Sequence, residues 1–321
     1  MKKISIKGLW EVLKKSVVGF IDDKILKLSA ALAYYTVFSL APLFLIIIFL
    51  GGFFLGKEAI EGSLYSQAAG FIGKESALQL QTMVKSAAVD STKSNFAIIA
   101  GIITLAIGAT TVFSEIQDSI NQIWGLKPKP GKGIISFLMT RLLSFGVIAS
   151  LGFLLLVSLG ISAVMDALNS RLMERFPDIT VMFFYILNLV LTFIITTSIF
   201  TVIFKVLPDA NVKFKDVLPG AVATGILFML GKFGISFYIS QADVGKTYGA
   251  AGSLVVLLVW IYFSAAILYF GAEFTKAYSV KFGYLIKPNS FAVTTRNVEV
   301  EEGKKSVQHV EKKKEKDKKE E

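Results

Sequence analysis

Six long apolar stretches restrict what this sequence can fold into. A helix needs about 20 mostly apolar residues to cross the hydrocarbon core of a bilayer. Stretches of this length occur at residues 31–55, 96–114, 141–165, 180–204, 217–238 and 251–274. A water-soluble domain would carry about a quarter charged residues, whereas this chain has 18% charged and 54% hydrophobic residues. The sequence therefore predicts an all-α, polytopic membrane protein with six transmembrane helices.

The distribution of lysine and arginine predicts the orientation. The N-terminal segment and the second and fourth loops together hold fourteen of these residues, and the first, third and fifth loops hold seven. Cytoplasmic loops carry the excess of positive charge, so we expect both termini in the cytoplasm. The net charge of +10 lies mostly beside apolar stretches, which favours a membrane partner over nucleic acid.

We divide the chain into three parts. Residues 1–27 form a cytoplasmic segment in which apolar side chains recur at helical spacing from Leu9 to Ile21, as in an amphipathic helix. Such a helix could lie on the inner membrane surface or dock on the bundle. Residues 28–283 form the six-helix transmembrane domain, with short extracytoplasmic helices predicted in the loop 57–95. Residues 284–321 form a charged tail, which we expect to be disordered.

The first apolar stretch carries polar residues and a proline on one face. Tyr35, Ser39 and Pro42 are spaced i, i+4, i+7 and therefore lie on the same side of a helix. Proline frees a backbone carbonyl, which neighbouring helices, hydroxyl groups or water must satisfy inside a membrane. We expect this face to look into protein or a wet cavity, where it serves packing alone or lines a path.

The end of the second stretch has two opposed stripes. The polar residues are Ser114, Gln117, Asp118 and Asn121, and the apolar ones are Phe113, Ile116, Ile120 and Ile123. This pattern predicts a helix that continues past the inner membrane surface, with Trp124 at the level of the headgroups. The polar stripe is either a solvated cytoplasmic face or the wall of a cavity, in which Gln117 and Asn121 face the substrate path.

Lys232 is an ionisable residue within the fifth stretch. It lies fifteen residues after Val217, about 22 Å along a helix axis, and so beyond the midplane. Its ammonium group either snorkels to the outer interface or faces inward, where ionisable residues mark functional paths. Our hypothesis is the inward orientation, in which Lys232 attracts an anionic lipid or another acidic amphiphile. Near the end of the sixth stretch, we expect Glu273 to form a helix-surface ion pair with Lys276, one turn later.

Four segments together resemble the YihY/BrkB family of bacterial inner-membrane proteins. They are AALAYYTVFSLAPLFL, GATTVFSEIQDSINQIWG, LPDANVKFKDVLPGAVAT and YGAAGSLVVLLVWIYFSAAILYFGAEF, and the resemblance covers about residues 10–283. It implies a six-helix protein of the bacterial inner membrane. The residues of these segments that we assign structural roles are Gly220, Tyr248, Gly249, Gly252 and Glu273, of which Gly249 and Gly252 loosen the outer end of the sixth helix.

The same resemblance brings a former label, ribonuclease BN. Metal-dependent RNA cleavage needs clustered carboxylates or histidines around an ion. This chain has one histidine, His309 in the tail, no cysteine, and scattered acidic residues without a paired-carboxylate motif. We therefore reject ribonuclease activity and expect no enzymatic activity, no cofactor and no metal site.

Two functions remain. The first is a transporter or flippase-like exporter of a lipid or other amphiphile in envelope biogenesis, which uses the polar faces of the first, second and fifth helices. The second is a non-transporting membrane scaffold for envelope assembly. The partners we expect are membrane lipids and an anionic lipid or amphiphile substrate, together with a second copy of the chain or an envelope-assembly partner.

Overall fold

The computed structural model describes residues 5–39, 62, 65, 77–78, 81, 111–129, 177–241, 252–282 and 286–295. These residues are mostly helical, as predicted. Most of the first and second predicted spans and all of the third lie outside them, as do Pro42, Tyr248 and Gly249. The expected short helices in the loop 57–95 also fall almost entirely outside the described residues.

Three described helices are long and apolar enough to cross a membrane. They are α7 (Pro177–Val206), α8 (Phe214–Gln241) and α10 (Gly252–Phe282), and their membrane-length portions are Met182–Val206, Phe214–Ile235 and Leu254–Phe282. They correspond to the fourth, fifth and sixth predicted spans, and α10 continues beyond the predicted end at residue 274. The total of six spans stays a prediction.

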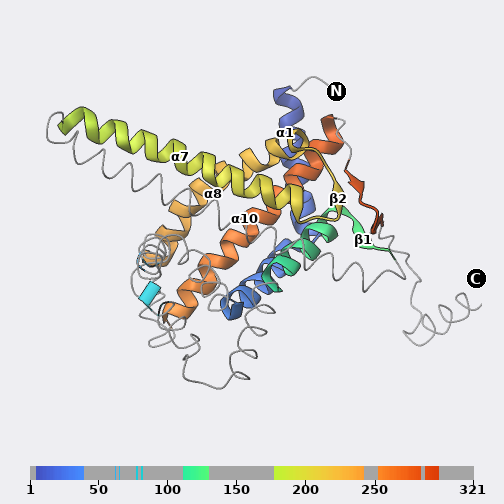
Figure 1. The fold of residues 1–321 in the computed structure, drawn as a ribbon, viewed down its shortest axis with the longest axis horizontal. Coiled ribbons are helices and arrows are strands. Elements are labelled where there is room, and N and C mark those ends of the chain that lie inside the picture. The colour runs from blue at the N-terminus through green and yellow to red at the C-terminus, as the bar shows by residue number, and fades with distance from the viewer. Residues whose placement is uncertain are drawn as a thin grey trace, which may run out of the picture.

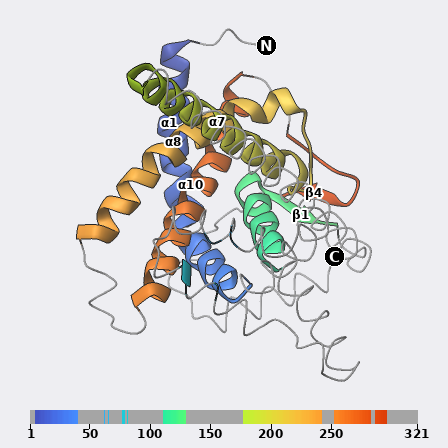
Figure 2. The ribbon, with the colours of Figure 1, turned by 60° about the vertical axis from the view of Figure 1, so that its left-hand side comes forward.

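These three helices cross near one end of the molecule and spread apart toward the other, as Figures 1 and 2 show. The last residues of α7 and α10 and the first residues of α8 lie at the common end, beside helix α1 (Ile6–Asp22). This arrangement follows from the short connection between α7 and α8, residues 207–213, which makes the two helices run in opposite directions. The main contacts are between α8 and α10, between α7 and α8, and between α1 and α10.

Two glycine–threonine contacts allow α8 and α10 to pack closely. A Cβ on Gly220 of α8 would lie 2.8 Å from Cβ of Thr275, and a Cβ on Gly271 of α10 would lie 2.9 Å from Cβ of Thr224. Each threonine hydroxyl donates a hydrogen bond to the carbonyl oxygen four residues earlier in its own helix, at 2.7 Å for Thr224 and 2.8 Å for Thr275. The hydroxyls are therefore satisfied locally, while the missing glycine side chains let the backbones approach.

Helix α1 docks on α10, one of the two arrangements that the sequence left open. It begins at Ser5, whose Oγ accepts a hydrogen bond from the Gly8 N–H at 3.1 Å, a normal N-cap. Val12 is buried in a cluster with side chains of α10, and Glu11 forms an ion pair with Lys281. The Lys281 ammonium lowers the pKa of the Glu11 carboxyl below its ordinary value by hydrogen bonding and charge.

The opposite face of α1 is apolar and exposed. Its exposed side chains include Ile6, Trp10, Leu13, Val17 and Ile21. Docking on α10 therefore uses only one side of this helix, and contact between the other side and the membrane surface stays a prediction. A turn at Asp23 and Lys24, where Lys24 has φ 53°, connects α1 to the next helix, Ile25–Ser39.

The helix over 111–124 buries its apolar stripe and two residues of its polar stripe, whereas Asp118 is exposed and Ser114 is half-buried. The apolar side chains Phe113, Ile116, Ile120 and Ile123 belong to the main core, and Gln117 and Asn121 on the other side are 2% and 4% exposed. A solvated cytoplasmic face is therefore wrong for these two residues. The depth predicted for Trp124, at the headgroups, stays a prediction; its ring is buried and its Nε1–H donates to the Ala272 carbonyl of α10 at 3.1 Å.

Two short antiparallel ribbons tie the ends of the helices together. Strand β1 (Leu126–Pro128) pairs with β4 (Ala292–Thr294), and β2 (Ala210–Asn211) pairs with β3 (Lys287–Pro288). Residues 286–295 are thus part of the fold, and the expectation that the disordered tail begins at residue 284 is wrong for them. They are ordered because the backbone N–H and C=O groups of residues 126–128 and 210–211 have no partners within a helix and form hydrogen bonds with them.

Candidate functional site

The common end of the helices contains a buried carboxylate held by amide groups. Asp209 follows Pro208 in the connection between α7 and α8, and it is 8% exposed. Its carboxylate accepts hydrogen bonds from Asn121 Nδ2 at 2.9 Å, Asn289 Nδ2 at 3.1 Å and Gln117 Nε2 at 3.3 Å. We call Asp209, Gln117, Asn121 and Asn289 the amide cage.

Backbone hydrogen bonds reinforce the amide cage. The Asp209 N–H donates to Asn121 Oδ1 at 2.8 Å, and the Asn289 N–H donates to the Asp209 carbonyl at 2.9 Å. Burial of a carboxylate is costly unless hydrogen bonds replace its water, and here three neutral amides supply them. Gln117 and Asn121 can both reach Asp209 because they lie one turn apart on the same helix face. The amide cage therefore acts as a rigid junction between three chain segments.

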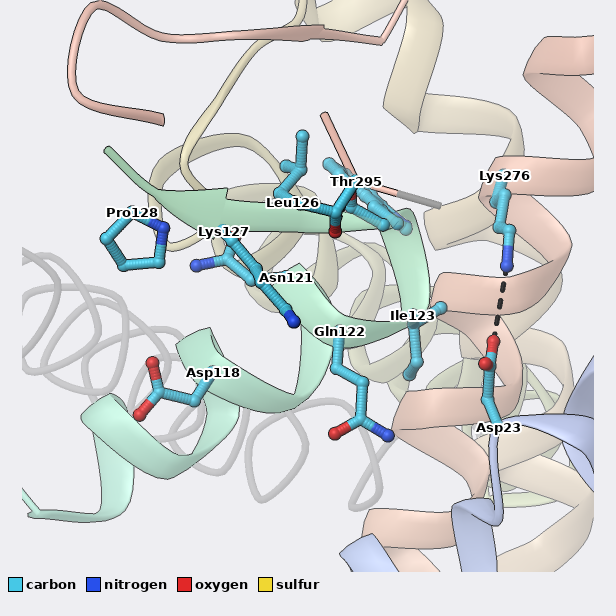
Figure 3. Close-up of a pocket in the computed structure, with 12 residues that line it drawn as sticks. Asp23, Asp118, Asn121, Gln122, Ile123, Leu126, Lys127, Pro128, Lys276 and Thr295 are labelled. Carbon is cyan, nitrogen blue, oxygen red and sulfur yellow. Dashed lines mark hydrogen bonds and ion pairs between the residues drawn. The ribbon is translucent and has the colours of Figure 1, made fainter. Parts of the chain in front are cut away.

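A cavity of about 530 Å³ lies next to the amide cage. Its lining comes from the turn after α1, from the end of the helix over 111–124, from β1, from α10 and from Thr295. Figure 3 shows Asp118 and Lys127 on one side of the view and the Asp23–Lys276 pair on the other, with Asn121 and Gln122 between them. The lining thus combines apolar side chains with charged side chains of both signs, although α10 is a membrane-length helix.

The charged groups around the cavity differ in what they contact. Lys276 Nζ lies 3.2 Å from Asp23 Oδ2 and 3.2 Å from Glu273 Oε1, so two carboxylates neutralise this ammonium group. Asp118 and Lys127 form no ion pair with another residue in the part of the chain that the structure describes. A ligand in the cavity can therefore contact the Asp118 carboxylate and the Lys127 ammonium group, neither of which forms an ion pair with a described residue.

The surroundings of Asp118 disfavour its charged form. Partial desolvation, followed by the negative charge of Asp209, raises the pKa of the Asp118 carboxyl above its ordinary value. A positive group bound beside Asp118 would relieve this repulsion. The described residues contain no group of three or more acidic or histidine side chains arranged as metal ligands.

The structure separates the residues that the sequence grouped as a path. Asn121 lines the cavity and Gln117 lies one turn away in the amide cage. Ser39 is buried, whereas Tyr35, on the same helix, is 39% exposed. Lys232 is half-buried on α8 and does not line the cavity.

Of the residues given structural roles, Gly220 packs against Thr275, and Gly252 is buried at the start of α10. Glu273 forms the expected ion pair with Lys276, but it is 2% exposed and does not lie on the surface. The reason is that α1 covers it: a Cβ on Gly19 would lie 2.7 Å from Glu273 Cδ.

Sequence reasoning missed Asp209, Asn289 and Asp23. The signal for Asp209 was present, since an acidic residue in a short connection between two membrane-length helices needs water or a partner. Asn289 carried no such signal, because it lies in the segment assigned to the tail. Asp23 also carried no such signal, because it follows the amphipathic stretch that ends at Ile21.

Membrane-length helices that converge at one end, beside a cavity with charged lining residues, define a helical membrane protein. The chain belongs to the family described as Virulence factor BrkB, whose match covers residues 16–291. This match extends past α10 and includes β3 and Asn289 of the amide cage.

Curated relatives carry the name UPF0761 membrane protein. The protein from Alcanivorax borkumensis is 29% identical over 278 residues, which make up 85% of this chain and 61% of the relative. The protein from Pseudoalteromonas translucida is 30% identical over 264 residues, 81% of this chain and 83% of the relative. The protein from Pseudomonas aeruginosa strain LESB58 is 28% identical over 258 residues and extends well beyond the match, which covers 59% of it. No solved structure matches this chain.

Proposed function

We propose that this protein is a transporter or flippase-like exporter that moves a lipid or another amphiphile across the bacterial inner membrane during envelope biogenesis. The observation that carries the proposal is the cavity beside α10, lined by apolar side chains and by charged side chains of both signs, at the end where three membrane-length helices converge. An amphiphile needs a polar place for its headgroup next to an apolar surface for its chains. The helices supply that surface, with exposed apolar side chains such as Ile194, Leu230 and Phe233.

The depth of the cavity supports this role. The portion of α10 from Leu254 to Phe282 has 29 residues, about 43 Å at 1.5 Å per residue. This length matches a bilayer with its headgroup regions, about 40–45 Å. Lys276 lies six residues before the end of α10, about 9 Å along the axis, so the cavity lies near the boundary between hydrocarbon and headgroups.

The positions of the lysines support the proposed orientation, with both termini in the cytoplasm. Lys127, Lys205, Lys213 and Lys281 belong to segments that meet at the common end of the helices, together with α1. An excess of positive charge at one end favours the cytoplasmic side. The cavity then opens toward the inner leaflet.

The transport path in this proposal joins two regions. The cavity beside the amide cage receives the polar group, and Lys232 on α8 attracts an anionic group deeper in the membrane. The proposal also assigns Tyr35 and Ser39 to this path, from their shared face on the helix of the first span. We propose binding and movement without catalysis, with the amide cage in a structural role, because three of its side-chain amides donate hydrogen bonds to the Asp209 carboxylate.

Reconstitution into liposomes tests the proposed function. The purified full chain is incorporated into vesicles that contain a fluorescent phospholipid, and the fraction of label accessible to an external quencher is followed with time. We expect accessibility to rise above the half that protein-free vesicles give, with ion flux measured in parallel. Accessibility that stays at half for both neutral and anionic labelled lipids would refute transport and leave the scaffold as the better explanation.

A further inference from the structure

We propose that the cavity binds a phosphoethanolamine headgroup, with Asp118 receiving the ammonium group and Lys127 receiving the phosphate. This inference rests on the proposed function and names the class of its substrate, an aminophospholipid. It is argued from the size of the cavity, the state of each charged group in it and its depth in the membrane.

The cavity has the size of a site for a small polar group. Small-molecule sites have volumes of about 300–1,000 Å³, and this one measures about 530 Å³. It is lined by both polar and apolar side chains, and it lies next to helices with exposed apolar surface. The acyl chains of a bound lipid could therefore remain along the helices while the headgroup enters the cavity.

The negative side of the cavity favours a cation. Asp118 lines the cavity, the charge of Asp209 acts on it, and Glu115 precedes it on the same helix. Asp209 is satisfied by the amide cage, which leaves Asp118 as the carboxylate that a ligand can reach. The side-chain oxygen of Gln122, which also lines the cavity, offers a second acceptor for an ammonium group that carries N–H donors.

The positive side of the cavity leaves one lysine for a phosphate. Lys276 is bound by both Asp23 and Glu273 at 3.2 Å, so its charge is already balanced. Lys127 is exposed on β1 and lines the same cavity. A headgroup with one positive and one negative charge satisfies Asp118 and Lys127 together. A purely anionic headgroup would instead place negative charge near the carboxylates of Asp118, Asp209 and Glu115.

The pH dependence of binding follows from the groups that face the ligand. Asp118, Lys127 on β1, Asp23 and Lys276 line the cavity, and Glu115 on the same helix, Asp209 in the α7–α8 connection and Tyr269 on α10 lie near Asp118 outside the lining. The raised pKa of Asp118 places its loss of charge at a higher pH than for an ordinary aspartate. Since the ammonium group needs the ionised carboxylate, affinity should fall as the pH is lowered through this range.

The test measures binding to the purified full chain in detergent by calorimetry. The probes are dihexanoyl phosphatidylethanolamine, glycerophosphoethanolamine, dihexanoyl phosphatidylcholine and dihexanoyl phosphatidylglycerol. We expect the ethanolamine lipid to bind at least about tenfold more tightly than the choline and glycerol lipids. Equal binding of the three lipids would overturn the proposal.

Two isosteric variants and two controls assign the site. Asp118→Asn should weaken ethanolamine-lipid binding by about tenfold or more and remove its pH dependence, and Lys127→Gln should weaken binding of the ethanolamine and choline lipids alike. Asp22→Asn and Lys215→Gln change exposed residues outside the cavity and should leave binding unchanged. Unaltered affinity in Asp118→Asn would overturn the assignment, and the pH titration of the unmodified protein tests it without any variant.

The soluble probe identifies the source of the headgroup. Weaker binding of glycerophosphoethanolamine than of the ethanolamine lipid supports a membrane lipid, whereas equal binding would overturn a lipid substrate in favour of a soluble one. The outcome is separable from that of the liposome assay. Lipid movement without Asp118-dependent binding would overturn this inference alone, and Asp118-dependent binding without lipid movement would overturn the proposed function alone.

Discussion

The substitution Gly220→Ala tests how closely α8 and α10 must pack. A Cβ at this position would lie 2.8 Å from Cβ and 3.1 Å from Cα of Thr275, with the threonine hydroxyl oxygen nearer still. Carbon atoms in contact prefer about 3.5–4.0 Å, so even if Oγ1 of Thr275 rotates away, the two helices must separate locally by roughly 0.7–1.2 Å. A gap of this size forfeits about a quarter to a half of the dispersion energy of the contacts that it opens.

The expected loss of stability is about 1–3 kcal/mol, the usual range for an overpacked core. The reciprocal contact between Gly271 and Thr224 opens with it, because it belongs to the same helix crossing. The assay is thermal unfolding of the purified protein in detergent, in which we expect a clear fall in the midpoint temperature. Gly234→Ala is the matched control on α8, since a Cβ there would meet no atom within 4 Å, and its midpoint should change little.

A double variant checks the cause. Thr275→Gly removes both Oγ1 and Cβ and leaves only the 3.1 Å approach to Cα. Combined with Gly220→Ala, it should recover part of the lost stability, so that the two effects are not additive. The reasoning would be refuted by equal midpoints for Gly220→Ala and Gly234→Ala, or by effects that simply add in the double variant.

Four further outcomes are expected. Lys232→Met should abolish lipid movement without lowering expression and Lys232→Arg should retain part of it; full activity of the methionine variant in liposomes would leave only snorkelling as the role of Lys232. Pro42→Ala should restore a backbone hydrogen bond, and a loss of activity at unchanged thermal stability would distinguish a path from packing. Deletion of residues 298–321, which have no apolar face to dock, should leave insertion and the melting temperature unchanged. A reporter at the C-terminus should be cytoplasmic and one inserted near Ser91 external, and detection of both on the same side would contradict the six-span topology.

Much of the fold follows from local composition. Backbone groups cannot remain unpaired in a bilayer, so each apolar stretch must form a helix, and α7, α8 and α10 confirm three of the six predicted spans. The sequence also determined that Asn121 and Gln117 share a face with Asp118, because helical spacing alone sets which side chains are neighbours. What occupies the space opposite that face could not be predicted in this way.

Tertiary structure decided the site itself. Asp209 is 88 residues from Asn121 and 80 residues from Asn289, and no local pattern links segments so far apart. Their pairing depends on how the helix ends converge, which is set by close contacts such as Gly220 with Thr275. The same convergence buries Trp124 and allows strands β3 and β4 to form within residues 286–295, because free backbone groups in the connections find partners there. Apolar length therefore determines which segments enter the membrane, and the packing of their ends determines where the polar groups meet.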